Sequence, residues 1–451
     1  MTRVTNFDSP MIQHAYKERV VDLMDPSADV FLTGTRDDVV RALEAADVEG
    51  LRSVSGQFAV MQRSGKRVRL ARSIGRPMRY FLAKRAEGPC LVVAERMDEI
   101  RDFLDAEGLG DQFHPSYTRM VPAHYMIELE LVGCPDPSPQ YNRFFDPKQG
   151  NLAPDPEAIG QNYIGALAQA CDRWLDTVPV DAPIGVLFSG GIDSGAVFLV
   201  MRHLLLARGQ APTRLKAFTL RVAGGEDAAQ AFDFVDRLGH SMYLEIVDVA
   251  LEDLDYKAAI AVTEDYKPLD VQSAAAALAL CREIRNRYPD WKYLVDGDGG
   301  DENLKDYPIE ENPELTIRSV LNNMMLYQEG WGVHAIKHSL TYSGGQSRGH
   351  VRSYAPAKSL GFRGFSPFAI PEVIEVAEGI PFIELTEWDH DRLYALKGQV
   401  VAAGIRALTG EDMPVFDKRR FQRGVVDEAG FQSAFPEGEA AYRDAFAALY
   451  P

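Results

Sequence analysis

Cysteine is scarce in this chain, and the few that occur follow no regular spacing. The 451 residues include Cys90, Cys134, Cys171 and Cys281, without a C-x-x-C pair or an adjacent histidine cluster. A disulfide framework or a structural zinc site needs closely spaced cysteines. The sequence therefore favours neither, and we expect these thiols to be buried and inert.

Long apolar runs and an excess of positive charge are also missing. No segment reaches the ~20 uninterrupted apolar residues of a membrane helix, and the polar segment Met1–Asn6 does not resemble a signal peptide. The formal net charge is −18, from 66 acidic and 48 basic residues, which disfavours a nucleic-acid partner because the phosphate backbone repels an acidic protein. We therefore expect a cytoplasmic protein that binds neither membranes nor nucleic acids.

The pattern that is present indicates two domains, because a chain of this length exceeds what one hydrophobic core normally supports. Up to about residue 145 the apolar segments are short and β-like, with helical patches at 37–46 and 97–104. The segment 134–156 is rich in Pro, Asp, Asn and Gly, which is typical of a boundary. We predict one domain over residues 1–150 and a second over residues 151–451.

In the second domain, helical and strand patterns alternate. The expected strands cover residues 184–188, 215–222, 242–247 and 292–295. The expected helices cover residues 157–177, 194–207, 227–238 and 271–288, and a later one runs from Thr386 to Leu408. This alternation predicts an α/β fold with a doubly wound parallel sheet, on which ligands bind beyond the carboxyl ends of the strands.

Ser189–Ser194, with the sequence S-G-G-I-D-S, stands between a predicted strand and a predicted helix; we name it the glycine loop. Gly190 and Gly191 let backbone N–H groups approach an oxyanion, and the helix adds its positive dipole end. Asp193 would repel a polyphosphate unless a divalent cation lay between them, which indicates a Mg²⁺ ligand. An ordinary strand–turn–helix connection is the alternative, but the order of strand, loop and helix favours a nucleotide site.

Asp296–Glu302, with the sequence D-G-D-G-G-D-E, follows the last predicted strand; we name it the acidic loop. Its carboxylates repel one another and its glycines weaken local order, so the loop is unfavourable unless a bound cation offsets the charge. An exposed acidic turn or an unrelated calcium loop is the alternative. The loop is too short for an EF-hand.

Together the two loops resemble the asparagine synthetase family, including its β-lactam synthetase and carbapenam synthetase relatives. The glycine loop matches the family's S-G-G-x-D-S, and the acidic loop matches S-G-x-G-x-D-E with Asp in place of the leading Ser. The resemblance implies a PP-loop ATP pyrophosphatase fold with a helical C-terminal part, ATP and Mg²⁺ as cofactors, and Asp193 and Asp301 as metal ligands. The nucleotide contacts that it implies are Leu187, Ser189, Gly190, Gly191, Asp193, Ser194, Leu220, Asp296 and Gly297.

A third match lies at Pro414–Gly424, which resembles the family's late lysine loop. Lys418 aligns with the lysine that neutralises charge on the reacting phosphate and acyl centre, a role that suits a compact ammonium. In isolation the segment is typical of a solvated basic loop. Beside the other two loops, Lys418 is the expected catalytic lysine, whereas Lys397 on the preceding predicted helix is expected to be structural.

The N-terminal region resembles the family's N-terminal-nucleophile glutaminase domain, an α+β sandwich. The matching segments are Val54–Ala59, Arg76–Phe81 and Val121–His124. Glutamine hydrolysis in that fold needs a cysteine exposed by removal of the first methionine, whereas position 2 here is Thr, and no N-G-E motif is present. We therefore expect no glutamine hydrolysis, as in β-lactam synthetases, and an amine that comes as ammonia or on a substrate.

The substrate side also departs from the family. Asp298 stands where asparagine synthetases have Glu and β-lactam synthetases have Tyr, and the acidic residue before the family's R-x-x-x-S-M run is replaced within Ser347–Arg352. This argues against asparagine as the product. Glu264 and Tyr266 precede a predicted helix near the expected pocket and are candidates for contact with the substrate. The predicted catalytic residues are Lys418, Asp298 and Glu264.

The resemblance implies an AMP-forming carbon–nitrogen ligase of specialised metabolism, which adenylates a substrate carboxylate, releases pyrophosphate and passes the acyl group to an amine. Small-molecule carboxylates and amines are the expected partners, and a homodimer is left open. Intramolecular ring closure, as in β-lactam synthetases, and a non-catalytic nucleotide-binding or scaffold protein are the alternatives. A tRNA-modifying enzyme with a similar glycine loop is disfavoured by the acidity of the chain.

Overall fold

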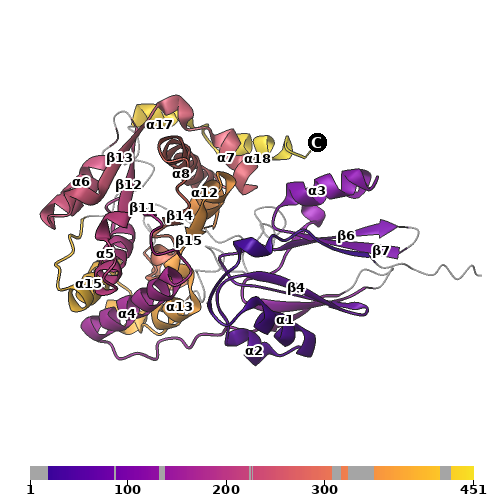
Figure 1. The fold of residues 1–451 in the computed structure, drawn as a ribbon, viewed down its shortest axis with the longest axis horizontal. Helices are drawn as coiled ribbons and strands as arrows, with labels where there is room; N and C mark the ends of the chain where they lie inside the picture. The colour runs from indigo at the N-terminus through magenta and orange to yellow at the C-terminus, as the bar shows by residue number, and fades with distance from the viewer. Residues whose placement is uncertain are drawn as a thin grey trace, which may run out of the picture.

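A computed structural model describes residues 19–85, 88–131, 138–222, 225, 227–306, 316–322, 350–416 and 428–450. An N-terminal part made of β-sheets lies beside a C-terminal part in which helices surround a second kind of sheet (Figure 1). The last strand of the first part ends at Arg143 and the first helix of the second begins at Pro156. The domain bounds 1–150 and 151–451 stay predictions.

The N-terminal part holds two four-stranded sheets. The first has the order β1 (Arg19–Asp22), β7 (Gly88–Ala94), β6 (Arg79–Arg85), β8 (Arg119–Met120). The second has the order β10 (Gln140–Arg143), β9 (Tyr125–Glu130), β5 (Arg67–Arg72), β4 (Ala59–Ser64). A shorter pair joins β2 (Val30–Thr33) to β3 (Ser55–Gln57).

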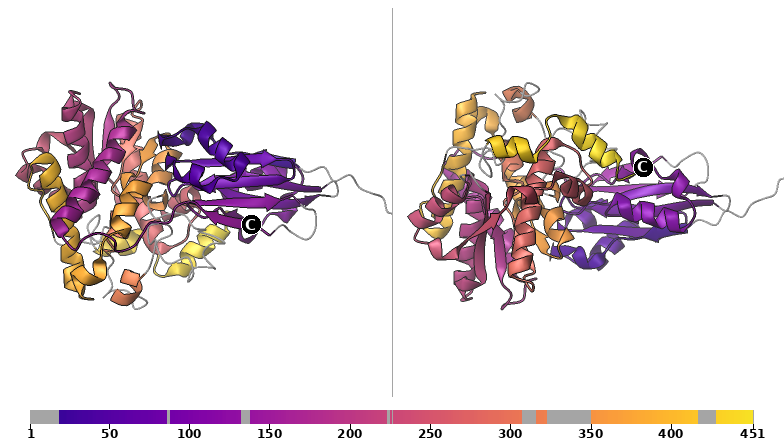
Figure 2. Two further views of the ribbon diagram at one scale, coloured as in Figure 1. Left: turned by 90° about the horizontal axis from the view of Figure 1, so that it is seen from below. Right: turned by 90° about the horizontal axis from the view of Figure 1, so that it is seen from above.

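The two four-stranded sheets lie face to face (Figure 2), with apolar side chains between them. Leu70 and Ile127 of the second sheet meet Leu91 and Val93 of the first. Helix α1 (Arg36–Ala45) packs on the outer face of the second sheet, and α3 (Met97–Ala106) packs on the outer face of the first. The result is an α+β sandwich; its relation to N-terminal-nucleophile hydrolases stays a prediction.

The C-terminal part is built on a five-stranded sheet in which all strands are parallel. Its order is β13 (Leu244–Val249), β12 (Leu215–Val222), β11 (Ile184–Leu187), β14 (Tyr293–Val295), β15 (Arg363–Phe365). The chain adds β12 and β13 on one side of β11 and then crosses to β14 on the other side. The predicted doubly wound parallel sheet is thus confirmed, and its switch point lies between β11 and β14, where ligands bind on such sheets.

Helices cover both faces of this sheet. One face packs against α4 (Pro156–Leu175), α5 (Ile192–Ala207), α6 (Asp227–Arg237) and α15 (His390–Thr409). The other packs against α7 (Tyr256–Thr263), α8 (Pro268–Arg287), the π-helical turn η8 (His350–Tyr354) with α12 (Ala355–Ser359), and α18 (Glu439–Ala447). The shorter helices are α2 (Val48–Arg52), α9 (Gly300–Asn303), α10 (Ile317–Asn322), α13 (Pro371–Glu378), α14 (Phe382–Thr386) and α17 (Glu428–Ala434).

Two glycines let α4 and α15 cross in close contact. A Cβ added to Gly160 would lie 2.2 Å from the carbonyl oxygen of Val400, and one added to Gly404 would lie 2.2 Å from the carbonyl oxygen of Gly160. Any larger side chain at either position would force the two backbones apart. These glycines therefore set the position of α15 over the sheet.

The start of α15 differs from its prediction. Thr386 ends α14, and Glu387 and Trp388 adopt left-handed backbone conformations with φ of 49° and 63°. A helix cannot continue through two such residues. Helix α15 therefore begins after Asp389, whose side chain accepts a hydrogen bond from its first turn. It ends at Thr409, one residue beyond the predicted Leu408, and Gly410 with φ of 76° follows it.

The expectation that the cysteines are buried is met within the described residues. Cys90, Cys171 and Cys281 are buried free thiols, and burial raises the pKa of all three, that of Cys281 to about 12. Cys134 lies outside the described residues. None of the helices that the structure describes combines the length and the apolar composition that crossing a membrane requires.

Candidate functional site

The glycine loop leaves the carboxyl end of β11 and enters α5 within four residues. Gly190 has φ of 74°, and a Cβ there would lie 2.6 Å from the Cα of Ala231, so only glycine fits. The backbone N–H of Gly191 donates to Ser189 Oγ at 3.2 Å, and that of Ser189 donates to Ser194 Oγ at 3.2 Å. This compact turn places the loop at the positive end of α5.

The acidic loop leaves the neighbouring strand β14 and lies directly against the glycine loop. A Cβ at Gly297 would lie 2.7 Å from the backbone nitrogen of Ser194, and a Cβ at Gly300 would lie 2.2 Å from Asp193 Oδ1. Glycine is needed at Gly297 because the two backbones touch, and at Gly300 because the side chain of Asp193 lies against it. The structure therefore brings together the two loops that the sequence singled out.

Lys397 of α15 joins the two loops. Its Nζ lies 2.6 Å from Asp193 Oδ2 and 3.3 Å from Asp306 Oδ2, and it also contacts Asp301 Oδ1. Its side chain is 3% exposed. Burial lowers the pKa of Lys397, but the three carboxylates raise it further, so the pKa lies well above its ordinary value and the amine stays charged.

The sequence favours a structural role for Lys397, whereas the structure puts its amine between the two predicted metal ligands. One sequence signal was available. Lys397 is a single cation among the buried apolar residues of α15, including Leu393, Leu396 and Val400, and a lysine is seldom buried unless it is paired.

Asp193 and Asp301 have the chemistry of a Mg²⁺ site. Asp193 Oδ1 is buried and makes no hydrogen bond with any described residue, and burial raises the pKa of this carboxyl. Within the described part of the chain, no three His, Cys, Asp or Glu side chains form a metal site on their own. Mg²⁺ is commonly held by one or two carboxylates together with substrate phosphates and waters. The pair therefore fits Mg²⁺ bound with a polyphosphate.

Asp296 and Asp298, at the start of the acidic loop, form a buried carboxylate pair. Asp296 accepts hydrogen bonds from the backbone of Asp298 at 3.1 Å and from Ser366 Oγ at 2.9 Å, and Asp298 accepts one from Ser353 Oγ. Burial raises the pKa of Asp296 to about 7; burial and the charge of Asp296 raise that of Asp298 well above its ordinary value. The pair therefore retains a proton readily. Ser353 and Ser366 were not identified from the sequence.

The comparisons with known proteins bear on this region of the chain. The family model for asparagine synthase matches residues 166–359, which include both loops and the carboxylate pair. This region is therefore similar to the asparagine synthase family. Lys397 and Lys418 lie beyond the matched residues.

Individual relatives are more distant. Asparagine synthetase [glutamine-hydrolyzing] 2 of Lotus japonicus is 26% identical over 238 residues, which cover 51% of this chain and 37% of that protein. The chain thus matches little more than a third of the length of this curated relative.

Among solved structures, NMN synthetase from Francisella tularensis is 14% identical with a TM-score of 0.23, covering 59% of this chain and 99% of that one. NAD⁺ synthetase from Burkholderia pseudomallei is 16% identical with a TM-score of 0.26, covering 66% and 91%. At these TM-scores, neither similarity establishes a shared fold.

Within the matched region, Glu264 is held by protein groups. Its carboxylate is 1% exposed and accepts hydrogen bonds from the backbones of Met97 and Asp98 and from the hydroxyl of Tyr450. Protein donors from the N-terminal part and from Tyr450 therefore occupy it, and its predicted catalytic role stays a prediction. Tyr266 packs against Phe446 of α18, with ring centroids 5.5 Å apart.

The roles of the other predicted residues stay predictions. Leu187 ends β11 half-buried, and Leu220 is buried near the carboxyl end of β12. Both lie on the side of the sheet that α8 covers. Their contact with adenine stays a prediction. Lys418 lies outside the described residues, as do Thr2 and the first three residues of Ser347–Arg352.

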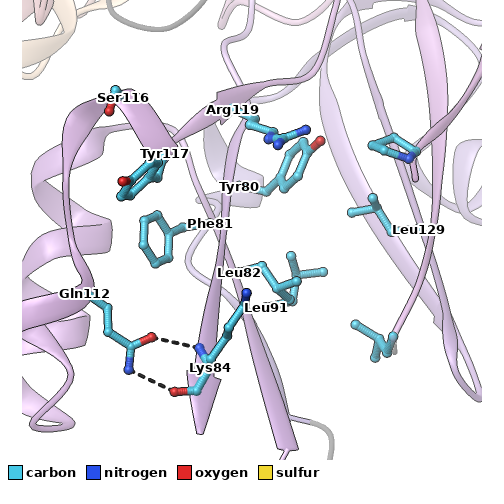
Figure 3. A pocket seen from close by; sticks show the side chains of 12 residues that line it. Tyr80, Phe81, Leu82, Lys84, Leu91, Gln112, Ser116, Tyr117, Arg119 and Leu129 are labelled. Atoms are coloured by element: carbon cyan, nitrogen blue, oxygen red, sulfur yellow. Dashed lines mark hydrogen bonds between the residues drawn. The ribbon is translucent and has the colours of Figure 1, made fainter. Parts of the chain in front are cut away.

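A cavity of about 350 Å³ lies elsewhere, in the N-terminal part (Figure 3). Tyr80, Leu82 and Leu129 line it between the two sheets. At the rim of the cavity, the side chain of Gln112 forms two hydrogen bonds of 2.8 Å with the backbone of Lys84. All of its lining residues belong to the segment 80–139. The cavity is therefore separate from the two loops of the asparagine synthase region.

Proposed function

We propose that the chain is an ATP-dependent ligase that adenylates a carboxylate and joins the acyl group to an amine, without hydrolysing glutamine. One observation carries this proposal. Asp193 and Asp301, from loops far apart in the sequence, meet on the amine of Lys397 beside a glycine turn at a helix N-terminus. This combination suits a polyphosphate with a divalent cation, and both loops lie in the region that matches the asparagine synthase family.

Each group of residues has its own task. The glycine loop holds the ATP phosphates with its backbone N–H groups, and Lys397 supplies a fixed positive charge beside them. Asp193 and Asp301 would hold Mg²⁺, which would offset phosphate charge and make the α-phosphorus more electrophilic. Lys418 is predicted to neutralise the charge that develops when the substrate attacks.

The reaction then has two steps. A substrate carboxylate oxygen attacks the α-phosphorus, the bond between the α-phosphorus and its bridging oxygen breaks, and pyrophosphate leaves. The amine next attacks the acyl carbon and loses a proton, and AMP leaves as the acyl C–O bond breaks. Asp298, whose pKa is raised by burial and by Asp296, is suited to accept that proton. Because residue 2 is Thr, the amine is ammonia or part of a substrate.

Product analysis tests the proposal. The full chain is incubated with Mg·ATP and panels of carboxylic acids and amines, and equal amounts of pyrophosphate and AMP are expected with the true substrates. Asp193→Asn should abolish turnover, whereas Asp233→Asn, on an exposed surface pair with Arg237, should not. Formation of ADP alone would contradict adenylation, and nucleotide binding without turnover would favour the non-catalytic alternative. Product from one molecule that carries both groups would indicate ring closure.

A further inference from the structure

We propose that Glu264 is a positioning residue. Through it, the N-terminal part holds in place the segments around Asp298, on the substrate side of the site. The inference rests on the proposed function for its kinetic consequence. It gives the N-terminal part a task that does not involve glutamine.

The carboxylate of Glu264 caps the first turn of α3. Its Oε2 accepts from the backbone N–H of Met97 and its Oε1 from that of Asp98, both at 2.9 Å. Tyr450 Oη donates to Oε1 at 2.8 Å. A carboxylate is favoured at a helix N-terminus because it accepts orphan N–H groups at the positive end of the dipole. Here the cap and the helix come from different parts of the chain.

Two arginines of the N-terminal part reinforce this contact. Arg79 Nη1 lies 3.2 Å from Glu264 Oε2, and Arg96 Nη2 lies 3.6 Å from Oε1. Arg96 also donates to the carbonyl oxygens of Ala261 and Val262, at 2.8 and 2.5 Å. The end of α7 is therefore fixed to the N-terminal part in two ways: through the backbone carbonyl groups of Ala261 and Val262, and through the side-chain carboxylate of Glu264.

The chain and two side-chain contacts lead from Glu264 to the carboxylate pair. Helix α8 begins at Pro268 and has Asp270 in its first turn. Asp270 Oδ1 lies 2.9 Å from Arg352 Nε. Ser353, the next residue, donates a hydrogen bond to Asp298. Displacing the turn between α7 and α8 would thus move the partners of Asp298. The glycine loop belongs to other elements, β11 and α5.

Steady-state kinetics of the full chain separates this role from simple structural support. Glu264→Ala should raise the KM of the carboxylate or amine substrate about tenfold while leaving the KM of ATP nearly unchanged. Glu264→Gln, which keeps one acceptor oxygen, should fall between wild type and Glu264→Ala. Glu252→Ala, at an exposed position before α7, is the matched control. An unchanged substrate KM with only a lower kcat would overturn the proposal.

Hydrogen exchange of the free protein gives a second measurement that needs no activity. Glu264→Ala should speed amide exchange at residues 97–98 and also at 267–273, but not at 192–201 of α5. If Glu264→Ala does not fold, Tyr450→Phe should produce the same pattern more weakly. Faster exchange confined to 97–98 would overturn the inference. If wild type makes no pyrophosphate with any acid, the proposed function fails, and the exchange pattern still decides the positioning role.

Discussion

Lys397 lies where three carboxylates would otherwise repel one another. Asp193, Asp301 and Asp306 all contact its amine, which is almost completely buried. A buried charge without its counter-charge is costly, so each member of this cluster depends on the others. The sequence motifs identified Asp193 and Asp301 because such loops have local patterns. Lys397 could not be placed in the same way, since only the packing of α15 brings it to them.

Replacing Lys397 by methionine tests this dependence. Lys397→Met should lower the free energy of unfolding by about 3 kcal/mol, because buried carboxylates lose their cation. Added MgCl₂ should restore part of that loss, since the divalent cation replaces the missing charge. Urea unfolding with and without MgCl₂ measures both effects. Lys216→Met removes a half-exposed pair with Glu245 and should cost less than about 1 kcal/mol; an equal loss in both variants would contradict the prediction.

The carboxyl of Asp296 should make stability depend on pH. Burial raises its folded-state pKa to about 7, above the ordinary 3.8, so the folded protein keeps a proton that the unfolded chain loses. The stabilising contribution is therefore complete below the unfolded value of 3.8 and is lost as pH rises through about 7. Asp296→Asn should remove this loss and gain on the order of 2 kcal/mol relative to wild type between about pH 5 and about pH 8. Denaturation midpoints at both pH values check this, and parallel curves for the two proteins would refute it.

At the scale of elements, the crossing of α4 and α15 sets the geometry of the site. Gly160 and Gly404 allow backbone contact between these helices, and α15 carries Lys397. In the same helix α4, Gly165 has no atom within 4 Å of an added Cβ. The two positions on one helix thus form a natural comparison.

Gly160→Ala should lower stability by roughly 2 kcal/mol, because the added methyl group forces α15 away. Gly165→Ala should instead stabilise α4 by about 0.5–1 kcal/mol, as expected for Ala in place of Gly inside a helix. Thermal unfolding of both variants gives the comparison. Similar shifts of Tm in the same direction would show that the crossing does not constrain α15.

Periodicity predicted most elements of the parallel sheet, and the two loops fell at the predicted strand ends. The misses have physical causes. Strand β15 has only three residues, too few for a period to appear. Helix α15 was predicted to begin too early because left-handed residues such as Glu387 and Trp388 leave no mark on an apolar pattern. The role of Glu264 depends on contacts with α3, which no local pattern reveals.

At the scale of the whole molecule, polar contacts join the N-terminal and C-terminal parts, and the one between Arg79 and Glu264 is fully buried. Ser55 Oγ donates to Glu372 at 2.7 Å, Lys358 Nζ lies 2.5 Å from Glu95, and Arg79 lies 3.2 Å from Glu264. Such contacts are costly to break one partner at a time. The two parts should therefore respond together when a ligand binds to either.

Mg·ATP should accordingly raise the Tm of the entire chain. Binding to the folded state alone stabilises by about 2.7 kcal/mol when the ligand is at 100 times its Kd, and calorimetry should show one shifted transition. ATP with EDTA, or Mg·ATP with Asp193→Ala, should give little shift. A split into two transitions, with only one moving, would show that the parts unfold independently.

The late position of Lys397 in the chain has a consequence for biosynthesis. Helix α15 follows all five strands of the parallel sheet, so a ribosome has already released both loops when the lysine is translated. Until that helix docks, the nascent protein carries unneutralised aspartates and no finished pocket. Maturation of the site is therefore among the last events of folding.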